Sequence, residues 1–135
     1  MNEPVPWLPC WYVAFVDSAQ TAWWLRWLKP GFRHCEAFAW DEASRRWVVA
    51  GAHLDVTVVR PLTNDMFDAY MAELTRRKAV IVLAKAQGGG RWRPAPFSCV
   101  SFVASLLGLP GLCAVRPYGL YRKLLALGAT EVMGP

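Results

Sequence analysis

Residues 94–108 read PAPFSCVSFVASLLG, a proline-rich approach followed by a short apolar segment. Ser98 is a good N-cap, because its hydroxyl can accept a hydrogen bond from an orphan backbone N–H of the first helical turn. Gly108 stands where a left-handed C-cap would end the helix. One buried face is predicted from apolar residues that recur at helical spacing: Phe102, Val103, Leu106 and Leu107. We therefore predict a short helix with Cys99 in its first turn.

The position of Cys99 makes it a candidate nucleophile. The N-terminal end of a helix favours an anion, so a thiol in the first turn has a lowered pKa and ionises more readily. The alternative is that Cys99 is a small buried apolar residue, since free cysteine is among the most buried residue types. A thiol nucleophile also needs a base within hydrogen-bond reach and a third group that orients the base.

Length and composition predict one domain over residues 1–135, with residues 1–10 as an extended, proline-rich arm. Hydrophobic residues make up 55% of the chain, charged residues only 19%, and there are eight tryptophans, which together exclude a disordered protein. This apolar content favours a partner or assembly interface. The formal charge of +5 fits an anionic partner such as nucleic acid, a membrane surface or a cell-wall polymer, although a basic soluble protein explains it as simply.

Four cysteines form neither a CxxC pair nor a zinc-ribbon spacing: Cys10, Cys35, Cys99 and Cys113. No basic leader with an apolar core opens the sequence, and the apolar runs are shorter than the roughly 20 residues that span a bilayer. These features predict a cytoplasmic location with reduced thiols, no signal peptide and no transmembrane segment. We expect no metal and no cofactor.

The sequence predicts an α+β domain in which helices pack against an antiparallel meander sheet. Strands are expected at 11–16, 32–40, 46–49, 53–59 and 79–86, with a turn at 41–44. Helices are expected from Asp17 or Ser18 to about Leu28, from Thr63 or Asn64 to about Lys78, over 98–107, and over 116–125. Residues 87–93 form a glycine-rich loop that lacks the lysine and spacing of a phosphate-binding loop.

Only two histidines are available as the base, His34 and His53. His34 lies near the start of a predicted strand, and a hairpin turning at 41–44 would place it roughly opposite Gly51. His53, at the start of the next predicted strand, would then be close enough to orient it. Glu36 and Asp55 are the competing candidates for this role, and His53 is otherwise an ordinary strand-end histidine.

Three segments resemble a known family. They are FRHC at 32–35, with a histidine early in a strand; FSCVSFV at 97–103, with a cysteine opening an apolar helix; and the closing RPYGLY at 116–121. Over about residues 11–127 the chain resembles the circularly permuted branch of the NlpC-like, papain-fold cysteine hydrolases. Its small phage and prophage versions are the most similar. The permuted branch, which includes the lecithin:retinol acyltransferase-like proteins, has the histidine strand before the cysteine helix.

The resemblance implies that Cys99 is the nucleophile and His34 the base of a thiol hydrolase. The third member would be a polar residue on the strand after the histidine. Residues 50–52 are Ala-Gly-Ala, which departs from the family pattern and leaves His53 as the candidate. Substrates implied by the resemblance are peptidoglycan stem peptides or other acyl groups, and the location would be the host cytoplasm or a virion.

Three other functions remain open. The first is a non-catalytic phage virion or assembly protein that keeps the fold and binds other virion proteins. The second is a metal site built from His34, Cys35, Cys99 and Cys113; we rank it low, because adjacent strand residues point to opposite faces. The third is nucleic-acid binding through scattered basic and aromatic residues, ranked below assembly: Arg91, Trp92, Arg93, Arg116, Arg122 and Lys123.

Overall fold

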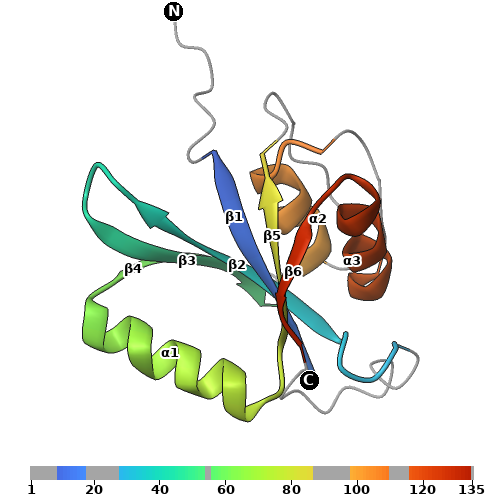
Figure 1. Cartoon of the computed structure of the whole chain (residues 1–135), viewed down its shortest axis with the longest axis horizontal. Coiled ribbons are helices and arrows are strands. Elements are labelled where there is room, and N and C mark those ends of the chain that lie inside the picture. Colours follow the sequence, from blue (N-terminus) through green and yellow to red (C-terminus); the bar gives the residue numbers. More distant parts are fainter. Residues whose placement is uncertain (1–8, 18–27, 54–55, 87–97, 110–115, 135) are drawn as a thin grey trace, which may run out of the picture.

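The computed structural model describes residues 9–17, 28–53, 56–86, 98–109 and 116–134. These residues form an α+β fold around one six-stranded antiparallel sheet with the order β4-β3-β2-β1-β5-β6 (Figure 1). The predicted α+β class is confirmed, and β1 to β4 form the predicted meander. The strands are β1 (Cys10–Val16), β2 (His34–Asp41), β3 (Arg46–His53), β4 (Val56–Leu62), β5 (Val80–Lys85) and β6 (Thr130–Met133).

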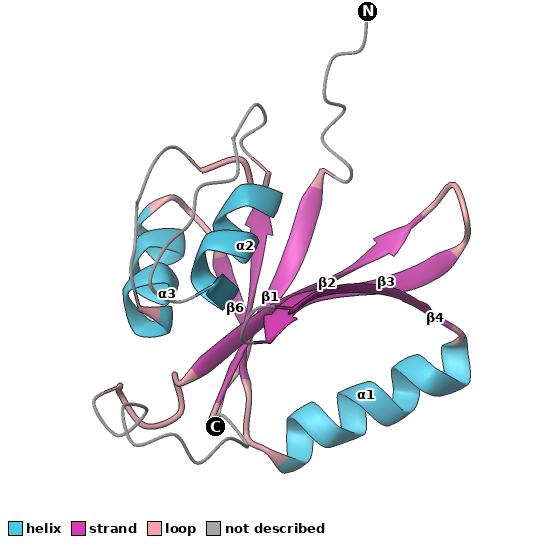
Figure 2. Ribbon diagram, turned by 180° about the vertical axis from the view of Figure 1, so that it is seen from behind, coloured by secondary structure: helices cyan, strands magenta, loops and turns pink. Residues whose placement is uncertain are grey.

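Three helices of the described residues cover the two faces of this sheet. Helices α2 (Ser98–Leu106) and α3 (Pro117–Ala126) lie on one face, and α1 (Asn64–Arg76) lies on the other (Figures 1 and 2). Helix α2 contacts β2 and β3, whereas α1 contacts β3 and β4. None of the helices in the described residues combines the length and apolar character needed to cross a membrane.

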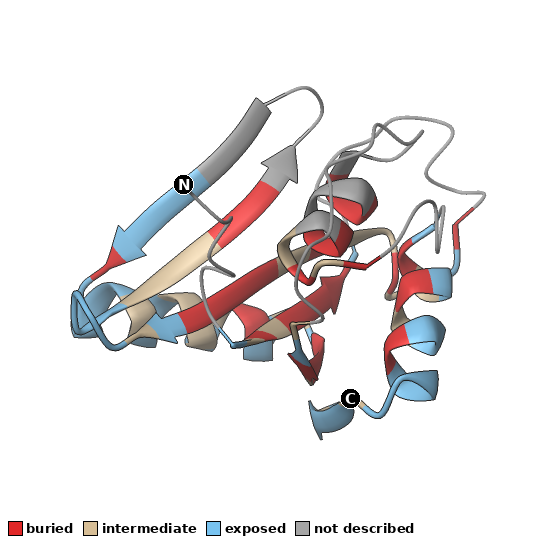
Figure 3. Cartoon of the chain, turned by 90° about the horizontal axis from the view of Figure 1, so that it is seen from above, coloured by how far each residue is buried: buried red, intermediate tan, exposed pale blue. Residues whose placement is uncertain are grey.

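Successive side chains of β1 point alternately into the two apolar layers of the core. Val13 and Phe15 belong to the cluster under α2 and α3, while Ala14 and Val16 belong to the cluster under α1. This strand is therefore buried on both faces, as its continuous apolar sequence predicts. Burial is concentrated in the central strands and the inward sides of α2 and α3, whereas the edge strands β4 and β6 carry exposed residues (Figure 3).

The hairpin of β2 and β3 turns at residues 42–45, one residue later than the predicted turn at 41–44. The Asp41 carboxylate closes the turn by accepting hydrogen bonds from the Ala43 N–H at 3.1 Å and the Ser44 hydroxyl at 2.8 Å. The ladder then runs from Asp41↔Arg46 to Ala37↔Ala50.

Two sequence-based details of this region were wrong. Extending the β2–β3 register places residue 51 level with Glu36 and not with His34 as expected, because the turn lies one residue later in the chain than predicted, which shifts the pairing by two residues. His53 ends β3 and does not begin the next strand, since β3 pairs with β4 as far as His53↔Val56. Strand β4 also continues through Pro61, which an edge strand tolerates because one side of it needs no ladder hydrogen bond.

Helix α1 begins at its predicted cap. Thr63 has extended backbone angles and accepts a hydrogen bond from the Met66 N–H at 3.2 Å. Phe67, one turn later, stacks on Trp47 of β3 with ring centroids 3.9 Å apart, which holds the helix against the sheet.

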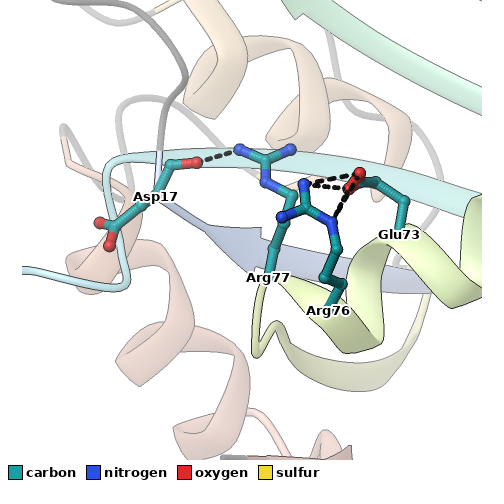
Figure 4. Close-up of polar contacts among 4 residues, drawn as sticks. All are labelled: Asp17, Glu73, Arg76 and Arg77. Carbon is teal, nitrogen blue, oxygen red and sulfur yellow. Dashed lines mark hydrogen bonds and ion pairs between the residues drawn. The ribbon is translucent and has the colours of Figure 1, made fainter.

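The other end of α1 is fixed by arginines. Arg76 binds the Glu73 carboxylate, and the Arg77 guanidinium donates to the backbone carbonyl of Asp17, directly after β1 (Figure 4). This contact joins the end of α1 to the end of the strand that pairs with His34. The helix is therefore anchored to the sheet near the start of β2.

Helix α2 ends in the predicted left-handed cap. Gly108 has φ +70°, and the Leu109 N–H donates to the Ala104 carbonyl at 3.0 Å, the long-range bond of a Schellman motif. Helix α3 starts with Pro117 at its first position, also as predicted. Strand β6 was not predicted; it adds to β5, and Glu131 accepts a hydrogen bond from the Tyr121 hydroxyl at 2.6 Å. The helix predicted for 17–28 and the loop at 87–93 lie largely or wholly outside the described residues.

Candidate active site

Cys99 is the second residue of α2 and lies in its first turn. Its residue is 8% exposed, and it belongs to the apolar cluster between α2, α3 and the sheet. The first-turn N–H groups of a helix have no partner within the helix, and the helix dipole adds positive potential there. The backbone at this position therefore favours a thiolate.

His34 is the first residue of β2, where the strand pairs with the last residue of β1, Val16. Asp17 holds the preceding turn by accepting from the Gly31 N–H at 2.6 Å and from the Arg33 guanidinium at 3.1 Å. Gly31 has φ +86°, a conformation that glycine adopts without steric cost. These contacts fix the start of β2 and therefore the backbone position of His34.

The structure brings Cys99 and His34 together. A side-chain hydrogen bond joins them, although the two residues are far apart in the sequence and lie on different elements. The His34 side chain is 13% exposed, so this contact is largely shielded from water. A hydrogen bond of this kind is what the sequence analysis expected of a nucleophile and its base.

Glu36 and Tyr70 extend the contact away from the sulfur. The Glu36 Oε2 atom lies 3.7 Å from His34 Nε2, and its Oε1 atom accepts a 2.6 Å hydrogen bond from the Tyr70 hydroxyl of α1. The carboxylate is 12% exposed. Residues 34 and 36 share a strand face, because side chains alternate along β2. The result is a series of polar groups in the order Cys99, His34, Glu36 and Tyr70.

Hydrogen bonds and charges in this series shift both pKa values toward an ion pair. The pKa of Cys99 is lowered to about 5, chiefly by a hydrogen bond from the Cys35 side chain and then by His34, against the opposing effect of burial. Burial alone would lower the pKa of His34, but the interactions of its ring with Cys99 and Glu36 outweigh burial and raise this pKa to about 9. At neutral pH the pair is therefore thiolate and imidazolium.

The same environment keeps the neighbouring acids protonated. Burial raises the pKa of Tyr70, and the Glu36 carboxylate raises it further. The pKa of Cys35 is raised well above its usual value, first by its hydrogen bond to Cys99 and then by burial. Both groups are hydrogen-bond donors at neutral pH, Tyr70 to Glu36 and Cys35 to Cys99.

Cys35 is the member of the site that sequence reasoning missed. Its side chain and backbone both hydrogen-bond to the Cys99 sulfur. In a regular strand it faces away from His34, which argued against the two acting together. The β2–β3 ladder ends at Ala37↔Ala50, so His34 and Cys35 lie beyond its end. Cys99 interacts with both of these residues there. The only signal in the sequence was its place next to His34.

The third member stays open between two residues. Glu36 is next to His34 in the structure, as one of the candidates named from the sequence. His53 is the last residue of β3, but its side chain and all of Asp55 lie outside the described part of the chain, so the assignment of His53 remains a prediction. The nearer members of the following strand, Ala50 and Gly51, are buried and apolar.

A cavity of about 540 Å³ lies on the α1 side of the sheet and reaches this series at the Glu36 carboxylate. Among the described lining residues Arg60 and Tyr70 are the other polar ones, and the rest are apolar. Gly51 contributes no side chain there, which leaves room beside Glu36. Glu36 therefore both lines this cavity and lies beside His34.

Among the described residues, no group of three or more histidine, cysteine or acidic side chains is placed to hold a metal ion. Cys113, the fourth candidate ligand, lies outside that part of the chain, as do Arg91, Trp92 and Arg93 of the nucleic-acid alternative.

A thiolate at a helix N-terminus, paired with an imidazolium, is suited to attack a carbonyl carbon. The orphan N–H groups of the first turn are donors that can stabilise the resulting oxyanion. Comparison of the chain with models of protein families, with curated proteins and with solved structures found no match.

Proposed function

We propose that the chain is a thiol hydrolase that transfers an acyl group from an amide or ester to Cys99 and then to water. The observation that carries the proposal is the hydrogen bond between Cys99 and His34 at the N-terminus of α2, with the pKa of Cys99 lowered to about 5 and that of His34 raised to about 9. An activated thiol with an adjacent base is the usual requirement for nucleophilic catalysis by cysteine.

The proposed reaction begins when the Cys99 sulfur attacks the carbonyl carbon and an S–C bond forms. Backbone N–H groups of the first turn of α2 stabilise the oxyanion. His34 gives its proton to the leaving amine or alcohol as the C–N or C–O bond breaks, which leaves a thioester on Cys99. His34 then takes a proton from water, and the hydroxide releases the acid and restores the thiolate.

In this proposal Glu36 is a positioning residue. Its carboxylate faces His34 Nε2 and is itself fixed by the Tyr70 hydroxyl. A carboxylate in this place stabilises the imidazolium and limits rotation of its ring, as the acidic member of a triad does. Cys35 is a second positioning residue, because its hydrogen bonds to the Cys99 sulfur stabilise the thiolate.

The chain order supports a circularly permuted papain-like arrangement, with His34 in β2 and Cys99 in the later helix α2. Peptidoglycan stem peptides are the first substrate to examine, on the resemblance in the sequence and on the net charge of +5, which favours an anionic polymer.

The proposal is tested first with p-nitrophenyl acetate, a small ester that needs no specific binding site. We expect intact mass to show one acetyl group on the wild-type chain and peptide mapping to place it on Cys99. Cys99→Ala should slow acylation by roughly a thousandfold or more. The matched control is Cys10→Ala, because Cys10 lies at the opposite end of β1 from the His34 pairing.

Digestion of purified peptidoglycan follows, with the released fragments identified by mass. Wild type and Cys10→Ala should release peptides, whereas Cys99→Ala should not. If Cys99→Ala is acetylated as fast as wild type, the hydrolase proposal is wrong and the non-catalytic assembly function becomes the better account. Circular dichroism of each variant shows that the comparison is made between folded proteins.

A further inference from the structure

The described residues include three free cysteines, and two of them lie together. Cys35 of β2 and Cys99 of α2 belong to the same buried cluster, and their side chains are hydrogen-bonded. The third, Cys10, lies at the other end of β1 from Phe15, the partner of Cys35. At about 3.3 Å per strand residue this puts Cys10 roughly 17 Å from the pair.

The surroundings of the two sulfurs give them different chemistry. Cys99 is the anionic sulfur and retains an exposed fraction of 8%, whereas Cys35 is protonated and fully buried. Peroxides react with thiolates and not with thiols, so the first oxidation is expected at Cys99. A sulfenic acid formed there would have a second thiol already in contact with it.

We propose that Cys99 is a site of reversible oxidation by hydrogen peroxide and that Cys35 resolves it by closing an intramolecular disulfide. The inference rests on the same sulfur as the proposed hydrolase function and would regulate it. Oxidation removes the nucleophile and, at the same time, protects it from irreversible damage.

Oxidation of the two cysteines by one peroxide takes two steps. The Cys99 thiolate attacks one peroxide oxygen; an S–O bond forms, the O–O bond breaks, and the departing hydroxide takes the proton of the His34 imidazolium to become water. The sulfur of Cys35 then attacks the sulfur of Cys99 as the Cys35 proton passes to the leaving oxygen. The S–S bond forms, the S–O bond breaks, and a second water leaves. Two thiols have lost two electrons and two protons to one peroxide.

Closing the bond requires the two sulfurs to approach each other. A disulfide has an S–S length of about 2.05 Å, shorter than any hydrogen-bonded contact between sulfurs. Cys35 lies beyond the end of the β2–β3 ladder and is paired with Phe15 of β1. The start of β2 and the first turn of α2 are therefore the segments that would approach each other.

The test treats the full-length chain with a small excess of hydrogen peroxide, blocks remaining thiols with iodoacetamide in denaturant, and maps the peptides by mass. We expect a linked peptide pair containing Cys35 and Cys99, a loss of two hydrogens, and full reversal by dithiothreitol. Cys10→Ser is the control and should behave as wild type.

Cys35→Ser removes the resolving thiol and nearly preserves the shape of the side chain. Without it Cys99 should gain two oxygens as a sulfinic acid, which dithiothreitol does not reverse. The proposal is overturned if wild type and Cys35→Ser give the same oxidised product, or if Cys35 remains fully alkylated after peroxide treatment of wild type.

Acetylation by p-nitrophenyl acetate is measured on the same untreated samples, so that the two proposals fail separately. An acetyl group on Cys99 without a disulfide after peroxide contradicts the redox inference alone. A disulfide without acetylation contradicts the hydrolase proposal alone.

Discussion

At the residue scale, the two pKa shifts set the pH range in which the site holds its ion pair. Cys99 loses its proton above about pH 5, and His34 keeps its proton up to about pH 9. Thiolate and imidazolium therefore coexist between these values. We expect a bell-shaped dependence of the acylation rate on pH, with limbs near 5 and 9.

Alkylation by iodoacetamide measures the acid limb directly. The rate at Cys99 in the folded chain should rise near pH 5, whereas in denaturant it should rise near the free-thiol pKa of about 8.5. Peptide mapping separates Cys99 from the other thiols. Equal midpoints for the folded and denatured chains would show that Cys99 is not activated.

Glu36→Gln tests the part assigned to the carboxylate. Because Glu36 helps to raise the pKa of His34, its removal should move the alkaline limb to lower pH. Each unit of that shift lowers the rate at high pH by about tenfold. Tyr70→Phe is the matched control, since it removes the 2.6 Å hydrogen bond but keeps the charge. An unchanged alkaline limb in Glu36→Gln would remove Glu36 from the site and favour His53.

At the scale of the element, the two ends of α2 have different tasks. The first turn presents Cys99, and the Schellman cap at Gly108 turns the chain so that Leu109 packs into the core. An L-residue at φ +70° is strained, so Gly108→Ala should lower the free energy of unfolding by about 1 kcal/mol.

Gly119 provides the comparison for that substitution. It is an exposed residue inside α3, where alanine has the better helix propensity, and Gly119→Ala should raise the free energy of unfolding by up to about 1 kcal/mol. Urea denaturation followed by circular dichroism measures both. The cap assignment fails if the two substitutions change stability in the same direction.

At the scale of the whole molecule, the position of the nucleophile depends on how α2 packs against the sheet. Leu107 is fully buried in the cluster that also holds Cys99 and Cys35. Leu107→Ala leaves a cavity there and should cost about 2–5 kcal/mol of unfolding free energy. We expect the acylation rate of the folded variant to fall as well, because α2 loses its fixed position.

Leu125→Ala is the matched control, because the Leu125 residue is 37% exposed on α3. It should change stability by no more than about 0.5 kcal/mol and leave acylation unchanged. Chemical denaturation and the p-nitrophenyl acetate rate are the two measurements. Similar losses of stability and acylation rate in both variants would show that the position of Cys99 does not depend on the packing of Leu107.

The sequence by itself determined the features that depend on neighbours within a few residues. The Thr63 cap, the turn closed by Asp41, the glycine at 108 and the first-turn place of Cys99 were all predicted. Capping and turn formation use hydrogen bonds that join nearby backbone and side-chain groups, so the residues that make them can be recognised from spacing alone.

Only the tertiary structure decided which distant side chains meet. The β2–β3 register differs by two residues from the expected one, and the hydrogen bond between Tyr70 of α1 and Glu36 of β2 joins residues 34 positions apart. The contact between Cys35 and Cys99 depends on where α2 packs across the sheet. Strand register and helix placement are fixed by the sum of many packing contacts, and no short spacing in the sequence records that sum.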